Sequence, residues 1–306
     1  MIELIDFTKW NIYDDAPYGS GASEKIWLID PKSNKTGIFK YPKIKTDGSI
    51  TGEYWAEKVA AELSKLIGIN CAEIDIGTYY GKRGSMSYNF LNKGESMLEG
   101  VSFITREYQI YNSDKMIDEF SGDKYSVQMI EKSFPWLFEN IIEMIVFDAL
   151  IGNSDRHHSN WGTIINVSEK QVNPFNNILP MKFAPLYDNG SSLCCRIAPD
   201  EVDVILKDNM RLEALIDSKS RSAIGFGNKR PIRHFELIEK MNFKYHDKMK
   251  NMMDKIRNNI NENAIKKLID SFENDIIDMK VKELLFIFLI KRCERLIRIY
   301  EGGSNG

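Results

Sequence analysis

The chain has 306 residues, of which 43% are hydrophobic and 28% are charged, as in an ordinary globular protein. Its 41 basic and 44 acidic side chains give a net charge of -3, so the whole chain carries no electrostatic footprint for nucleic acid or an anionic membrane. Because single hydrophobic cores stop growing at about 250–300 residues, we expect two lobes that share a core.

Nothing in the sequence predicts export or membrane insertion. The N-terminus, Met1–Asp6, has acids where a signal peptide has basic residues. The longest apolar candidate, Leu284–Ile290, is far shorter than the ~18 residues that span a bilayer. We expect a cytoplasmic protein, and delivery to another cell stays open. We expect reduced cysteines without a disulfide framework or a zinc motif: Cys71, Cys194, Cys195 and Cys293.

A segment of small residues, 18–25, precedes the first predicted strand. Its backbone N–H groups could approach phosphates closely, although a lone Gly-x-Gly is equally typical of an N-terminal linker. The segment lacks the Gly-Lys-Ser/Thr ending of a P-loop, so we exclude that class. We assign six of its residues to nucleotide binding: Gly19, Ser20, Gly21, Ala22, Ser23 and Lys25.

Two short β-rich runs, 25–29 and 37–41, flank a turn-rich segment and predict a hairpin. Lys40 comes at the end of the second run. Kinase-type sites place a strand lysine on the ATP phosphates and orient it with a helix glutamate. A single strand lysine is more often solvated, so only the order of the elements favours a role for Lys40 in binding.

Apolar residues at helical spacing predict a helix from about Trp55 to Ile67, with Thr51 as the N-cap and Gly68 as the stop. Glu53 and Glu57 begin this helix, and either could pair with Lys40.

A second strand pair is predicted at 73–80 and 85–91, joined by Gly81–Gly84. After about residue 92 the pattern becomes helical. Residues 139–150 form a broadly apolar helix, and at least three helices follow Phe235. We interpret 167–186 as a loop with short strands near 163–165 and 182–184, and 302–306 as a disordered tail.

The segment Gly152–Gly162 directly follows the apolar helix and contains no aliphatic side chain. Asp155 is followed by Asn160 five positions later, the interval of the protein-kinase catalytic loop. Phosphoryl transfer needs a carboxylate that receives the hydroxyl proton and oxygen ligands that hold Mg²⁺. Because Asp and Asn also cap turns, the spacing alone is weak, but the density of polar groups favours a catalytic loop.

Farther along, an apolar run from Phe183 ends in Asp188-Asn189-Gly190 and predicts a carboxylate at a strand tip. This matches the Asp-x-Gly element whose Asp binds Mg²⁺ in kinases. His157 and His158 suggest a zinc hydrolase only weakly, because adjacent histidines project differently and zinc needs three or four converging ligands. Support of the loop by Arg156 or His157 is the better interpretation.

Together these motifs resemble the HipA-like serine/threonine kinases. The resemblance is carried by four segments in order along the chain: Gly52–Tyr54, Gly152–Asn160, Leu186–Ser191 and Phe226–Ile232. It implies an α+β, bilobal protein-kinase-like fold with a small β-rich N-lobe (1–92) and a larger helical C-lobe (93–306). It also implies ATP and Mg²⁺ as cofactors and a protein hydroxyl as the acceptor.

The resemblance assigns roles to particular residues. Asp155 would be the catalytic base, Asn160 and Asp188 the magnesium ligands, and Lys40 the phosphate contact. Glu53 would be the helix acid near Lys40, with Glu57 as the alternative. Two further residues join the nucleotide-binding set: Phe90 and His157.

The chain departs from the full-length toxins of this family because it reaches Gly19 almost at once and so resembles a compact form. Pairing with an antitoxin at the usual surface is therefore in doubt, although an antitoxin partner and a toxin or effector role stay open. We expect autophosphorylation, at Ser20 or Ser23. Two alternatives remain: a small-molecule kinase of the aminoglycoside or choline type, and a non-catalytic nucleotide-binding regulator.

Overall fold

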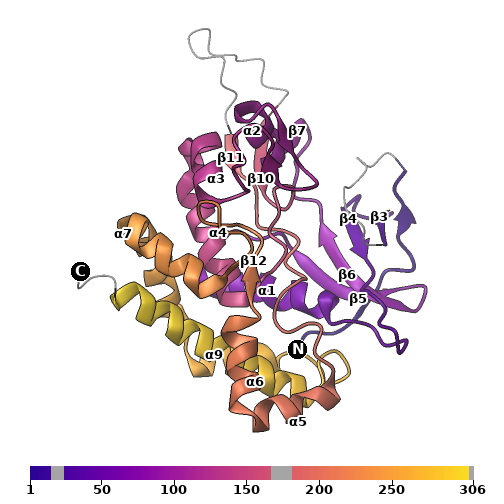
Figure 1. Ribbon diagram of the computed structural model, residues 1–306. Coiled ribbons are helices and arrows are strands. Elements are labelled where there is room, and N and C mark those ends of the chain that lie inside the picture. The colour runs from indigo at the N-terminus through magenta and orange to yellow at the C-terminus, as the bar shows by residue number, and fades with distance from the viewer. Residues whose placement is uncertain (15–23, 167–180, 303–306) are drawn as a thin grey trace.

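The computed structural model describes residues 1–14, 24–166 and 181–302, and it has an α+β fold (Figure 1). A six-stranded sheet forms the N-terminal part, in the order β1-β5-β6-β4-β3-β2. All its neighbours are antiparallel except β1 and β5, which are parallel. Its strands are β1 (Ile5–Asp6), β2 (Asn11–Ile12), β3 (Lys25–Ile29), β4 (Thr36–Lys40), β5 (Ile74–Tyr79) and β6 (Lys82–Tyr88).

Both predicted hairpins form, but the second has a tighter turn than predicted. Only Tyr80 and Gly81 connect β5 to β6, and Tyr79 lies opposite Lys82. Both turn residues have positive φ, 47° and 76°, as in the type I′ turns whose twist matches that of the flanking strands. The predicted loop over 81–84 is therefore wrong, because residues 82–84 already pair with β5.

The helix α1 (Glu53–Ile67) packs on β5 and β6 on one side and on α7 and α8 on the other, so it joins the sheet to the helical part. Gly68 ends it in the left-handed conformation, as predicted, with φ 68°. Thr51 is not the N-cap. Gly52 occupies that position without a side-chain hydrogen bond, and the Thr51 hydroxyl instead donates to the Glu53 carboxylate at 3.1 Å.

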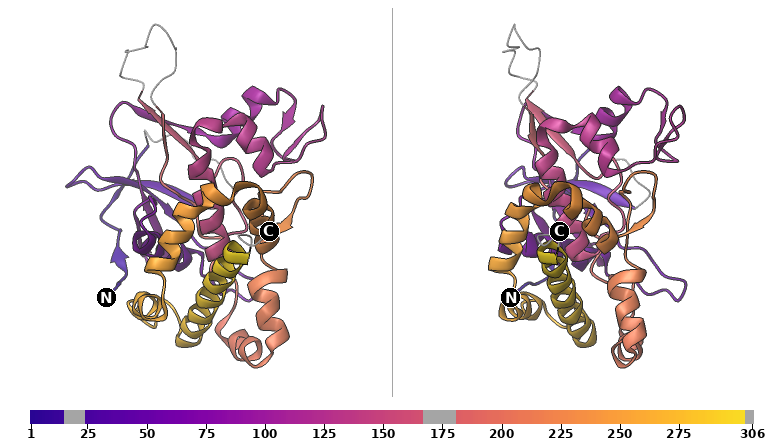
Figure 2. Two further views of the ribbon diagram at one scale, coloured as in Figure 1. Left: turned by 90° about the vertical axis from the view of Figure 1, so that its left-hand side faces the viewer. Right: turned by 60° about the vertical axis from the view of Figure 1, so that its left-hand side comes forward.

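The rest of the chain is mainly helical, and Figures 1 and 2 show α4, α7 and α9 lying against one another. Its helices are α2 (Gly100–Glu107), α3 (Val127–Ser133), α4 (Phe138–Ile151), α5 (Pro199–Lys207), α6 (Asn209–Glu213), α7 (His234–Asn259), α8 (Glu262–Asp270) and α9 (Met279–Gly302), with short turns of other helix types at Pro135–Leu137 and Ala214–Ser218. Its strands are β7 (Glu95–Glu99), β8 (Tyr111–Asn112), β9 (Ile117–Asp118), β10 (Gly162–Asn166), β11 (Met181–Phe183), β12 (Arg221–Ser222) and β13 (Ile232–Arg233).

The three helices expected after Phe235 are confirmed, as are the short strands around 163–165 and 182–184. The sequence did not indicate β7, which pairs with β10 in a three-stranded sheet. Gly302 is the last residue of α9 rather than part of a tail. The rest of the predicted tail and residues 167–180 lie outside the described residues. The domain boundary at residue 92 falls between β6 and β7 and stays a prediction.

The largest core is formed by α4, α7, α9 and the inner face of α1. The helix α4 is buried on nearly every side, which explains why its sequence is apolar all round. A smaller core lies under the six-stranded sheet, around Phe39 and Met86. None of the described helices is long and apolar enough to cross a membrane.

Candidate active site

A pocket lies where the six-stranded sheet and α1 meet the loops of the helical part. Its lining includes Lys40 from the end of β4, Glu57 from α1, Asp155 from the loop after α4 and Asp188 from the loop after β11. These four ionisable side chains come from segments far apart in the sequence. The fold therefore brings together the lysine and both aspartates that the motifs single out, along with both candidate glutamates, Glu53 and Glu57.

The loop that carries Asp155 begins where α4 ends at Gly152, whose φ of 71° favours glycine. Buried Asn153 then holds the loop in place. Its Nδ2 donates to Asp148 Oδ1 at 3.0 Å, and its Oδ1 accepts from the Asp155 N–H at 3.1 Å. Asp155 itself is exposed, and no described residue donates a hydrogen bond to its carboxylate. That carboxylate is therefore accessible from the pocket that Asp155 lines.

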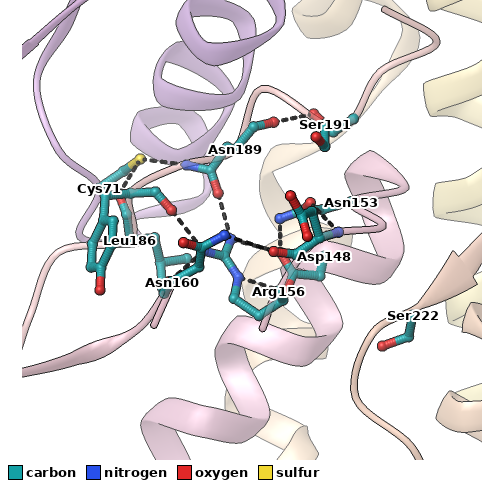
Figure 3. Close-up of polar contacts among 12 residues, drawn as sticks. Cys71, Asp148, Asn153, Arg156, Asn160, Leu186, Asn189, Ser191 and Ser222 are labelled. Atoms are coloured by element: carbon teal, nitrogen blue, oxygen red, sulfur yellow. Dashed lines mark hydrogen bonds and ion pairs between the residues drawn. The ribbon is translucent and has the colours of Figure 1, made fainter. Parts of the chain in front are cut away.

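Arg156 lies buried beneath the loop and uses all five of its N–H donors (Figure 3). Two of them form a bidentate pair with the Asp148 carboxylate at 2.8 and 2.9 Å. The others reach the carbonyl oxygens of Asn160 and Tyr187, at 2.8 and 2.7 Å, and Asn189 Oδ1 at 2.5 Å. One guanidinium thus fixes the loop of Asp155 against the loop of Asp188.

Burial alone would lower the pKa of Arg156, but the charge and hydrogen bonds of Asp148 outweigh it and raise that pKa. Arg156 is therefore a cation at every working pH. An ion pair as buried as this one is costly to break, because removing one partner leaves an uncompensated charge away from water.

Lys40 Nζ lies 2.7 Å from Asp188 Oδ1 and 3.8 Å from Glu57 Oε1. Burial acts to lower the pKa of Lys40, but the two carboxylates outweigh it and raise that pKa. Burial likewise acts to raise the pKa of Asp188, and the charge and hydrogen bond of Lys40 reverse this and lower it. Lys40 is therefore an ammonium and Asp188 a carboxylate at neutral pH.

The structure resolves the choice between the two helix acids. Glu57 forms the ion pair with Lys40, whereas Glu53 pairs with Lys43, Nζ to Oε1 at 3.4 Å, and accepts the Lys43 N–H. Glu53, which was expected to be the acid near Lys40, lines the same pocket and its charge acts on Lys40, but the ion pair is made by Glu57, the alternative acid. The Glu57 side chain is 5% exposed, and its Oε2 has no hydrogen-bond partner among the described residues.

The sequence predicted Asp188 at the tip of a strand, and this prediction is wrong. The strand β11 ends at Phe183, and Asp188 follows in a loop with its own φ at 57°. Gly190 serves close approach rather than a positive φ. A Cβ at Gly190 would lie 3.2 Å from the Glu53 carbonyl oxygen and 3.3 Å from Glu57 Cγ, so a side chain would push this loop away from α1.

The chemistry of the donor set fits Mg²⁺, which prefers oxygen ligands and retains several waters. Asp188 offers a carboxylate. Asn160 Nδ2 donates to the Asp155 carbonyl oxygen at 2.7 Å, so the amide oxygen of Asn160 is the atom left for a cation. A kinase-type site needs no further protein ligand, because the phosphates supply the remaining oxygens.

Three other predicted nucleotide-binding residues lie around this site. Lys25 begins β3 opposite Lys40. Phe90 lies 6.1 Å from the Tyr187 ring, centroid to centroid, just after β6. His157 is half-buried, and its Nδ1 accepts the Ser159 N–H at 3.2 Å. The proposed glycine-loop residues, 19–23, lie outside the described residues.

The sequence missed the buried supports of the loop. Asp148 lies in an apolar helix and was not singled out. An acid alone in an apolar helix, followed by an arginine in the next loop, was the signal that could have indicated a buried ion pair. A second support was also missed: the ring of His234 spans from Asn153 O, at 2.8 Å from Nε2, to Ser220 Oγ, at 2.9 Å from Nδ1. Burial lowers the pKa of His234 to about 3, so this histidine is neutral at physiological pH.

The fold is of the protein-kinase-like class. Its β-rich part carries a strand lysine that pairs with a helix glutamate, and two loops of the helical part each carry an aspartate. The sequence matches no protein-family model. It is 24% identical to the serine/threonine-protein kinase CtkA of Helicobacter pylori over 96% of this chain and 87% of that protein.

Two solved structures extend this comparison. The crystal structure of the proinflammatory kinase CtkA of Helicobacter pylori matches with a TM-score of 0.80 and 21% identity, over 99% of this chain and 98% of that one. HipA of Shewanella oneidensis, solved with HipB and operator DNA, matches with a TM-score of 0.55 and 15% identity, over 96% of this chain and 68% of that one. The predicted fold class and the resemblance to HipA-like kinases are confirmed.

Proposed function

We propose that this chain is an ATP- and Mg²⁺-dependent serine/threonine protein kinase of the HipA-like type. The proposal rests on one observation: Lys40, Glu57, Asp155 and Asp188 line one pocket. Along the chain, these residues follow the order of a kinase site. The 24% identity to a serine/threonine-protein kinase over 96% of the chain supports it independently.

Each residue would contribute a separate part of the reaction. Asp155, exposed in the pocket, would accept the proton of the acceptor hydroxyl as its oxygen bonds to the γ-phosphorus and the bond to the ADP oxygen breaks. Lys40 would bind the α- and β-phosphates, with Glu57 holding its ammonium in position. Asn160 and Asp188 would hold Mg²⁺, which supplies positive charge against the phosphates.

In the structure Lys40 forms an ion pair with Asp188. Phosphate oxygens would replace Asp188 as the partner of Lys40, and the Asp188 carboxylate would then be available to the cation. Arg156 keeps the Asp188 loop in register with the Asp155 loop during this exchange, because its bonds go to Asn160, Tyr187 and Asn189.

The test is the transfer of labelled γ-phosphate from ATP to the chain itself and to a mixture of protein acceptors, by wild type and Asp188→Ala. We expect labelled protein with wild type alone, including autophosphorylation. An equal signal from the two proteins would contradict the proposal. Transfer to amino alcohols or antibiotics in place of proteins would instead indicate the small-molecule kinase. A toxin role and an antitoxin partner stay predictions.

A further inference from the structure

A second pocket adjoins the first and has no role in the reaction described above. It is lined by residues of the Asp155 loop, of the segment 191–197 and of the segment 219–221, and also by Leu215 and Phe288. Ser191 lines both pockets. Ser154, directly before Asp155, also lines the second pocket, and its N–H donates to the Ser191 carbonyl oxygen at 3.1 Å. The proposed catalytic carboxylate therefore lies at the border of the two pockets.

The second pocket is lined by three cationic side chains, Arg196, Lys219 and Arg221, and by no acidic one. All three residues are exposed, and within the described part of the chain none of them has an ion pair with a carboxylate. The acid closest in sequence, Asp217, pairs with Arg233 and Arg295, at 3.6 and 2.9 Å, rather than with Lys219. The pocket thus combines an apolar lining, which includes Leu215 and Phe288, with basic residues and no acidic one.

Most exposed lysines and arginines are solvated and have no specific partner. Here three basic residues line one hollow, the hollow shares Ser191 with the catalytic pocket, and no carboxylate of the described residues forms an ion pair with any of the three. A phosphate-binding role for the same cations is less favoured, because Lys40 and the predicted magnesium ligands already supply the nucleotide side of the first pocket.

We propose that this second pocket binds acidic residues of the acceptor protein, so that a serine or threonine flanked by carboxylates is presented to Asp155. The inference rests on the proposed kinase function. Complementary charge at a partly exposed site steers association and selects among partners more than it adds raw affinity. A peptide lying across Ser191 would have its hydroxyl in the first pocket and its flanking acids in the second.

A binding measurement tests this inference without relying on catalysis. Two fluorescent peptides are compared by anisotropy: one has a serine flanked by glutamates, and the other has glutamine at the same positions. We expect wild type to bind the glutamate peptide about tenfold more tightly at low salt and to lose most of this preference at high salt. Lys219→Gln/Arg221→Gln should bind both peptides alike, whereas Lys248→Gln, which changes an exposed lysine on α7 outside both pockets, should keep the preference.

Several results would overturn the inference. These are equal binding of the two peptides by wild type, a preference that survives the double substitution, or binding of a phosphoserine-flanked peptide alone. Unfolding midpoints of the variants show whether they are folded. Phosphate transfer to the same peptides by wild type and Asp155→Ala is read separately. If that transfer occurs without an acidic preference, only the inference fails. If wild type transfers no more than Asp155→Ala, the kinase proposal fails whatever the binding data show.

Discussion

Two charged groups belong to this site, and they are built in opposite ways. The Arg156–Asp148 pair is buried, and every donor of the guanidinium is used. The Lys40–Glu57–Asp188 group is partly open, one carboxylate oxygen of Glu57 has no partner among the described residues, and Lys40 is shared between two acids. The first group holds two loops together, and the second contains the side chains that we propose bind the nucleotide and Mg²⁺.

The largest effect is expected from Arg156→Met. Removing the arginine leaves the Asp148 carboxylate buried without a counter-charge, so we expect unfolding to require about 3–5 kcal/mol less free energy. Denaturant unfolding measures this loss. The double variant Arg156→Met/Asp148→Leu should recover much of it, because a buried ion pair can be replaced by apolar side chains at little cost. A loss below about 1 kcal/mol in the single variant would contradict the role of the pair as the support of the loop.

Lys40→Met should show the reverse pattern. We expect kcat/KM for MgATP to fall about 100-fold or more, as when one preorganised electrostatic group is removed. The free energy of unfolding should change by about 1 kcal/mol at most, because Lys40 is partly exposed. Lys43→Met is the matched control on the same side of the pocket, and it should keep most of the activity. An equal loss of kcat/KM in the two variants would contradict a specific role of Lys40 in binding ATP.

Stability should fall as the pH decreases, because two buried histidines are neutral in the folded chain. Burial lowers the pKa of His158 to about 4 and that of His234 to about 3, from an ordinary 6.5. Their contribution is complete above pH 6.5 and declines as the pH falls towards the folded values, because the unfolded chain then binds protons that the folded chain excludes. We expect each to cost about 1 kcal/mol between about pH 6.5 and 5.5.

Denaturant unfolding of His234→Gln over the same pH range isolates one of these contributions. The variant keeps a side-chain donor for Asn153 O but cannot titrate, so its stability should depend less steeply on pH than that of wild type. Identical slopes for the two proteins would contradict a neutral His234.

The smallest effect is expected at Glu57, and its sign is unusual. Burial raises the pKa of Glu57 more than the attraction of Lys40 lowers it. The ionised form therefore costs stability at neutral pH, and the cost disappears as the pH falls through the raised pKa. We expect Glu57→Gln to gain about 1 kcal/mol of unfolding free energy at pH 7 and to lose about tenfold in phosphate transfer. Glu53→Gln, the control one turn away, should not gain stability. A less stable Glu57→Gln variant with full activity would contradict this account.

Local sequence signals predicted most of the elements. Apolar spacing gave α1 and α4, and Gly68 and Gly152 end them in the left-handed conformation. Two predictions were wrong where the residue type did not determine the local role of the residue. Thr51 resembles a helix cap but donates to Glu53, and the turn of the second hairpin begins at Tyr80, which has positive φ without being glycine.

The site was only partly predictable, for a physical reason. Asp155, Asn160 and Asp188 lie in polar loops whose composition marks them against apolar surroundings. The partner of Lys40 could not be predicted, because Glu53 and Glu57 are one helical turn apart. In the structure Glu57 pairs with Lys40, and Glu53 pairs with Lys43. Asp148 and His234 act through burial, and burial depends on which distant segments cover a residue.

The most direct test compares two aspartates seven positions apart. Phosphate transfer and the free energy of unfolding are measured side by side for wild type, Asp155→Asn and Asp148→Asn. We expect Asp155→Asn to abolish transfer and to keep the free energy of unfolding of wild type, because this carboxylate is exposed and is the proposed proton acceptor. We expect Asp148→Asn to be destabilised, because the substitution leaves Arg156 buried without its counter-charge. Transfer by Asp155→Asn at the wild-type rate would contradict the central claim that Asp155 is the catalytic carboxylate.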